Sequence, residues 1–105
     1  MSGVAKVAEA LLGAWRGDTT VEAAPLAGLL RDAQDAYAVQ ERVAAEAGWF
    51  DRPVPLHWKS GGPSREAVLT HAPLPPRRVW ESPASAVTAH FNLRLIEAEV
   101  ALRLA

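Results

Sequence analysis

The chain has 105 residues, a formal net charge of -1 at pH 7 and no cysteine. This length allows one domain with a single core. Without cysteine there is no disulfide scaffold or thiolate metal site, and a near-neutral charge without a basic patch excludes a typical nucleic-acid surface. Neither a secretory signal nor an apolar run long enough to span a bilayer is present, so we expect a cytoplasmic protein with no nucleic-acid or membrane partner.

Two amphipathic helices are predicted in the first half of the chain. The first covers residues 4–16, whose apolar side chains recur at helical spacing, with Ser2 as a candidate N-cap and Gly17 just past the end. A less regular link over residues 18–30 follows. In this link Pro25 interrupts any helix unless it lies in the first turn.

The second helix is predicted between Asp32, which can cap it, and Gly48, which can end it. Asp35 falls in the first turn, where a negative charge favours the positive end of the helix dipole. The pattern predicts that one face packs against another surface. Its members are Ala33, Ala36, Tyr37, Gln40, Val43, Ala44 and Ala47.

After Gly48 the composition changes from Ala-rich helix to Pro, Gly and Trp. Residues 54–60 alternate well enough to predict a strand, which residues 61–63 should break. A short helical turn is predicted over residues 65–69, then an extended path through residues 71–76 and a short strand over residues 77–80. The second half is therefore expected to be a small, irregular β portion.

The stretch of residues 96–105 reads Ile-Glu-Ala-Glu-Val-Ala-Leu-Arg-Leu-Ala. If it is extended, apolar side chains line one face, and Glu97 and Glu99 stand side by side on the other. Two like charges at that distance repel each other unless a cation, a proton or a basic side chain lies between them, so the pair is a candidate metal clasp. A solvated helix remains open, because Glu99 and Arg103 have i, i+4 spacing.

Lys59 is a further candidate, since it lies between Trp58 and a Gly-Gly turn that could make room for an anionic ligand or lower the pKa of the ammonium group. The alternative is a solvated strand lysine. The three histidines are spaced too irregularly to predict a metal site. Arg77 and Arg78 could clamp a carboxylate, or could simply be solvated.

Four motifs occur together: Leu-Leu-x-Ala-Trp at residues 11–15, Ala-Tyr-Ala-Val-Gln at 36–40, Trp-Lys-x-Gly at 58–61 and Ile-Glu-Ala-Glu-Val-Ala-Leu-Arg-Leu at 96–104. In this order and spacing the chain resembles the N-terminal part of the 2-keto-4-pentenoate hydratase branch of the fumarylacetoacetate hydrolase superfamily. That group also contains 4-oxalocrotonate decarboxylases.

The resemblance implies that Glu97 and Glu99 bind Mg²⁺ or Mn²⁺ together with a third acidic residue downstream, and that Lys59 assists proton transfer or substrate binding. The metal in that chemistry chelates a 2-oxo acid while water is added to a conjugated double bond or CO₂ is lost. The substrate would be a 2-hydroxy-2,4-dienoate or a 2-oxo acid of aromatic catabolism. The resemblance also favours the strand for the C-terminal stretch.

The expected fold class is α+β, with two N-terminal helices packed on the small β portion as a partial fumarylacetoacetate hydrolase-like fold. Residues 1–50 would form the helical segment and residues 51–105 the start of the β-rich catalytic portion of one truncated domain. We expect a homo-oligomer that is inactive as the isolated chain. The alternative is a non-catalytic, self-associating α+β domain.

Overall fold

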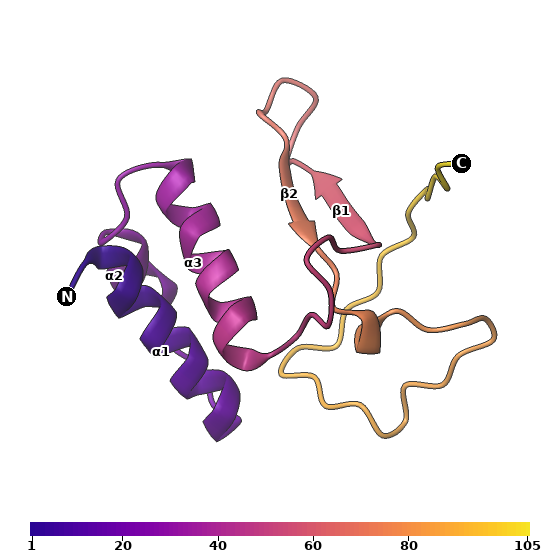
Figure 1. Cartoon of the computed structure of the whole chain (residues 1–105), viewed down its shortest axis with the longest axis horizontal. Coiled ribbons are helices and arrows are strands. Elements are labelled where there is room, and N and C mark those ends of the chain that lie inside the picture. Colours follow the sequence, from indigo (N-terminus) through magenta and orange to yellow (C-terminus); the bar gives the residue numbers. More distant parts are fainter.

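The computed structural model describes residues 1–105, and its three α-helices and one two-stranded antiparallel sheet confirm the α+β class (Figure 1). All three helices lie within the first 47 residues, and the hairpin and a long irregular stretch make up the rest. The likeness to the fumarylacetoacetate hydrolase fold stays a prediction. None of the helices combines the length and the apolar character needed to cross a membrane.

Helix α1, Gly3–Gly17, confirms the first predicted helix. The Ser2 hydroxyl accepts a hydrogen bond from the backbone N–H of Ala5 at 3.1 Å, which satisfies one of the free donors of the first turn. The C-terminal end differs by one residue from the prediction, because Gly17 is still helical. Asp18 takes the left-handed conformation instead, with φ of 54°, which an aspartate tolerates better than most residues.

The short helix α2, Ala23–Ala27, lies in the predicted irregular link and contains Pro25 in its first turn, where a proline needs no hydrogen-bond partner. Helix α3, Ala33–Ala47, has the predicted bounds. The Asp32 side chain caps its first turn, and Gly48 ends it with φ of 68°. This left-handed conformation is open to glycine at little cost.

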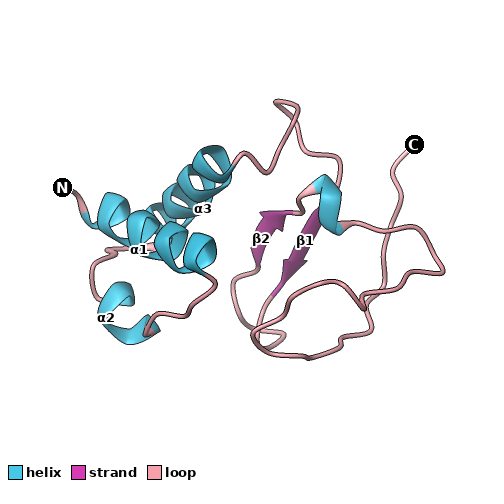
Figure 2. Cartoon of the chain, turned by 90° about the horizontal axis from the view of Figure 1, so that it is seen from below, coloured by secondary structure: helices cyan, strands magenta, loops and turns pink.

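Helices α1 and α3 lie side by side and run in the same direction, with the chain between them returning through α2 (Figures 1 and 2). Their facing side chains form the hydrophobic core, which contains Val7, Ala8, Leu12, Val39 and Val43. Only eight of the 105 residues are buried, and every one of them belongs to α1 or α3. The core is therefore confined to the helical part of the molecule.

The predicted packing face of α3 is only partly right. Val43 is buried as expected, but the buried row continues through Val39 to Asp35, at i, i+4 spacing. Ala36 is exposed, and Tyr37 is half-buried. The difference arises because α3 has two neighbours: one row of side chains faces α1, and the row that contains Ala36 and Tyr37 faces the hairpin.

Asp35 is the only buried polar residue, and it is fully partnered. Its carboxylate accepts hydrogen bonds from Nε and Nη2 of Arg31, both at 2.9 Å, and from the Arg31 backbone N–H at 3.0 Å. The side-chain and backbone hydrogen bonds from Arg31 lower the pKa of Asp35 to about 2. The ion pair fixes the start of α3, where a negative charge is also favoured by the helix dipole.

The hairpin pairs β1, Trp58–Gly61, with β2, Thr70–Pro73, so that Trp58 lies opposite Pro73 and Gly61 opposite Thr70. The strand predicted over residues 54–60 forms only at its C-terminal end and extends to Gly61, because residues 54–57 bend and make no ladder. Part of the predicted extended path after the turn becomes β2, since β1 supplies its backbone partners.

Two short elements predicted near the hairpin are wrong. Residues 65–67 form bends and residues 68–69 have no regular structure, so the helical turn is absent. One weak hydrogen bond joins the Ala67 N–H to the Ser64 carbonyl at 3.4 Å. The strand predicted over residues 77–80 is replaced by a 3₁₀ turn, η1, at Pro76–Arg78. The fixed φ of Pro76 suits such a turn.

The strand predicted over residues 96–105 does not form, and neither does the alternative helix: residues 79–105 contain no helix or strand. The backbone of residues 90–105 makes no hydrogen bond with another backbone group. The physical reason is the absence of a neighbouring strand, since an extended segment needs a partner to become part of a sheet. Ile96, Val100, Leu102 and Leu104 are between 86% and 96% exposed.

Candidate functional site

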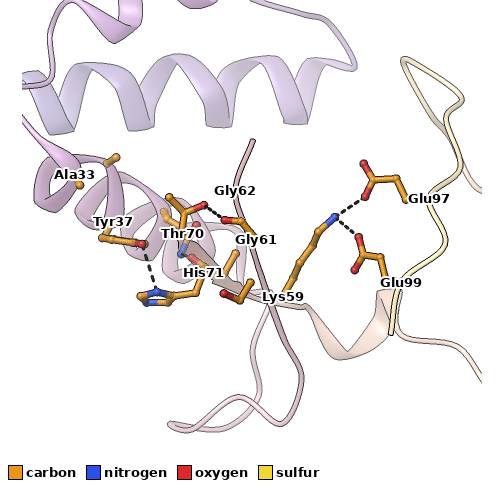
Figure 3. A pocket seen from close by; sticks show the side chains of 13 residues that line it. Ala33, Tyr37, Lys59, Gly61, Gly62, Thr70, His71, Glu97 and Glu99 are labelled. Atoms are coloured by element: carbon orange, nitrogen blue, oxygen red, sulfur yellow. Dashed lines mark hydrogen bonds and ion pairs between the residues drawn. The ribbon is translucent and has the colours of Figure 1, made fainter. Parts of the chain in front are cut away.

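The three residues that the sequence singles out meet at one place (Figure 3). The Nζ atom of Lys59 lies 2.9 Å from Oε2 of Glu97 and 2.8 Å from Oε1 of Glu99. Lys59 comes from β1, and both glutamates come from the irregular chain near the C-terminus. Although no strand forms there, the two carboxylates point to the same side, as the side chains of residues i and i+2 do in an extended chain.

The contacts set the charges of the three groups. Hydrogen bonds to Glu99 and Glu97 raise the pKa of Lys59 well above its ordinary value. The hydrogen bond from Lys59 is also the main cause that lowers the pKa of Glu97. The expectation that the surroundings lower the Lys59 pKa is therefore wrong. It was based on the neighbouring Trp58 and did not include the Glu97 and Glu99 carboxylates. In this arrangement Lys59 is a charged hydrogen-bond donor to both carboxylates.

These side chains remain open to solvent, with exposed fractions of 48% for Lys59, 67% for Glu97 and 50% for Glu99. Exposed ion pairs add little to folding stability, because water and salt screen them. One positive and two negative charges leave the group with a net negative charge. The cluster is thus accessible to a ligand and attracts cations.

The cluster borders a cleft of about 560 Å³ between α3 and the hairpin. Tyr37 and Gln40 line it from α3, and Thr70 and His71 line it from β2. From the sequence, Tyr37 and Gln40 were expected on a packing face, and His71 was not expected to belong to a site. This side of the cleft was therefore not predicted. The available signal was the pair of polar side chains, spaced i, i+3, on an otherwise Ala-rich helix face.

His71 joins the hairpin to α3. Its ring stacks on that of Tyr37, with centroids 4.6 Å apart and an interplanar angle of 22°, and the Tyr37 hydroxyl lies 3.3 Å from Nδ1. The Gln40 side-chain amide donates to the His71 carbonyl at 3.4 Å, and the Trp58 ring is tilted against the His71 ring with 5.9 Å between centroids. These contacts fix the wall of the cleft that faces the cluster.

The other candidates lie elsewhere. His57 borders a separate cleft, and His90 pairs with Asp18 at 2.8 Å between Nε2 and Oδ1. The three histidines therefore do not converge. Arg77 and Arg78 lie in η1, outside the lining of the cleft, and form no ion pair.

The two carboxylates fit a divalent cation in part. Their oxygens are the ligand type that Mg²⁺ and Mn²⁺ prefer, and the Lys59 ammonium already holds a positive charge between them. Two side chains cannot complete an octahedral shell. No group of three or more His, Cys, Asp and Glu side chains is arranged to hold a metal ion.

Comparison of the chain with protein-family models, curated proteins and solved structures gives no match. The resemblance to the hydratase branch of the fumarylacetoacetate hydrolase superfamily stays a prediction from the four motifs.

Proposed function

We propose that this chain supplies part of the active site of a cytoplasmic, divalent-metal-dependent hydratase or decarboxylase that acts on 2-hydroxy-2,4-dienoates or 2-oxo acids. The observation that carries the proposal is the position of the Lys59 ammonium between the Glu97 and Glu99 carboxylates. These residues are separated by 38 and 40 positions in the sequence, and all three match the motifs of the resemblance. Unrelated surface charges would have no reason to meet at the same cleft, as Lys59, Glu97 and Glu99 do.

In this proposal Glu97 and Glu99 provide two oxygen ligands for Mg²⁺ or Mn²⁺, and water, substrate or a further acidic side chain completes the shell. The bound metal supplies Lewis-acid polarisation of the 2-oxo group. The Lys59 ammonium group leaves its position between the two carboxylates when the cation binds. This ammonium group is then free to donate a hydrogen bond to the carboxylate of the substrate.

The charges of the cluster also predict an order of binding. Without a metal, one ammonium and two carboxylates give a net negative charge, which repels an anionic substrate. With a divalent cation the same cluster becomes net positive. The metal should therefore bind before the 2-oxo acid.

The test is a titration with Mn²⁺, followed by the loss of the electron paramagnetic resonance signal of the free ion. The double variant Glu97→Gln with Glu99→Gln should bind Mn²⁺ at least about tenfold more weakly, because it loses both charged ligands. Glu66→Gln with Glu81→Gln is the matched control, since both of these glutamates lie outside the cleft. Equal affinity in all three proteins would remove the metal site from consideration.

Activity gives a separate test. Since two carboxylates are only part of a metal shell, we expect the purified chain with Mg²⁺ to hydrate a 2-hydroxy-2,4-dienoate weakly or not at all. Robust hydration that Glu97→Gln abolishes would contradict the view that this chain holds only part of the site.

A non-catalytic, self-associating α+β domain is the second candidate function. It is favoured by the small number of buried residues, eight of 105, and by the exposed apolar side chains near the C-terminus. In that case Glu97 and Glu99 are surface charges. The Mn²⁺ titration separates the two candidates, because the second one expects no difference between the double variant and its control.

A further inference from the structure

The C-terminal segment, residues 96–104, combines two features. Its backbone N–H and C=O groups have no hydrogen-bond partner in the protein, and its large apolar side chains are almost fully exposed. An extended, apolar stretch with free backbone groups is a template for pairing with another strand. The segment therefore lacks a partner strand.

The hairpin of the same copy is a poor partner. Its strand β1 is only four residues long, whereas the segment has nine. Lys59 holds the segment by its Glu97 and Glu99 side chains and forms no backbone ladder with it. A strand of matching length is needed to pair the backbone groups along one whole edge of the segment, and the same segment of a second copy has that length.

We infer that two copies of this chain associate through an antiparallel ribbon of their C-terminal segments, centred on Val100. In this register Val100 lies opposite the partner's Val100, Ala98 opposite the partner's Leu102, and Ile96 opposite the partner's Leu104. The apolar side chains of both copies share one face of the ribbon, because the side chains of a strand alternate between its faces.

The charges select this register. Glu97 lies opposite the partner's Arg103, and the two-fold symmetry repeats that pair at the other end of the ribbon. A parallel, in-register ribbon would instead place Glu97 against the partner's Glu97. On the polar face of each copy, Lys59 and Arg103 balance Glu97 and Glu99, so the antiparallel ribbon carries no net charge there.

The apolar face and the backbone of the ribbon do not involve the proposed metal site, whereas the charge pairs that select its register use Glu97, which that site shares. It is tested by sedimentation velocity over a range of protein concentrations. Wild type should change from monomer to dimer. Val100→Lys should remain monomeric, since two ammonium groups would then face each other at the symmetry axis.

Charge reversal tests the register. Arg103→Glu alone places two glutamates opposite each other at both ends, and Glu97→Arg alone does the same with two arginines, so each should weaken dimerisation at least about tenfold. Both cross-strand pairs become complementary again when the two single variants are mixed, and a heterodimer should form. The double variant Glu97→Arg with Arg103→Glu should also dimerise, as strongly as wild type. In a parallel, in-register ribbon the wild type, both single variants and the double variant would all have two like-charge pairs, so they would associate equally.

Glu99→Arg is the matched control, because it breaks a Lys59 contact but faces the partner's Ala101 in the ribbon. It should dimerise more strongly than either Glu97→Arg or Arg103→Glu. Amide hydrogen exchange gives a direct readout: residues 96–104 should become protected as the concentration of wild type rises. Wild type that stays monomeric, or double and single variants that associate equally, would overturn the inference.

Discussion

Replacing Leu12 by alanine should severely destabilise the helical part. Leu12 is 2% exposed and belongs to the cluster in which α1 packs against Val39 and Val43 of α3. Truncation removes three buried carbon atoms and leaves a cavity between two helices that the other core residues fill only in part. A buried leucine treated in this way typically costs about 3 kcal/mol of the free energy of unfolding. With a core this small, that is a large share of the total.

Urea unfolding followed by far-ultraviolet circular dichroism measures the effect. Leu11→Ala is the matched control, because the neighbouring side chain is 37% exposed and lies outside the core cluster. We expect Leu11→Ala to change the free energy of unfolding by less than about 1 kcal/mol. Equal losses in the two variants would refute the assignment of the core to this face of α1.

Four further substitutions test other parts of the structure. Lys59→Met should raise Mn²⁺ affinity about two- to fivefold in the titration described above, because a competing ammonium group is removed from the carboxylates. Asp35→Asn should lower the melting temperature at pH 7. Since the pKa of Asp35 is lowered by Arg31, this difference should persist above the ordinary value of 3.8 and vanish as the pH falls towards about 2. Gly48→Ala should destabilise the protein by about 1 kcal/mol, because its φ is 68°. Gly13→Ala, in the open interior of α1, should stabilise it by about 0.5–1 kcal/mol in the same urea assay.

The helices could be predicted because their boundaries depend on neighbouring residues. Ser2 and Asp32 each bind a backbone N–H three residues ahead, and Gly48 adopts a conformation that few other residues accept. The second half depends on partners that are distant in the sequence. The alternation of residues 96–105 indicates a strand only when a neighbouring strand is available to pair with it. Periodicity carries no information about whether such a neighbour exists.

The candidate site also has a part that could be predicted from the sequence and a part that could not. The resemblance singled out Lys59, Glu97 and Glu99, which do lie together, although the strand expected to carry the glutamates is absent. The stacking of Tyr37 on His71 joins residues 34 positions apart. Neither local propensity nor spacing can predict such a contact, because it follows from how α3 and the hairpin are placed.

The confinement of all eight buried residues to α1 and α3 has a consequence for the order of folding. The contacts that form the core close a loop of moderate length between two helices, which is typical of fast folding. During synthesis the first 50 residues can therefore collapse on their own while the rest of the chain is still emerging from the ribosome. The hairpin would dock afterwards onto a preformed α3 through His71. Pulse-labelling hydrogen exchange on refolding should then protect the amides of α1 and α3 before those of β1 and β2.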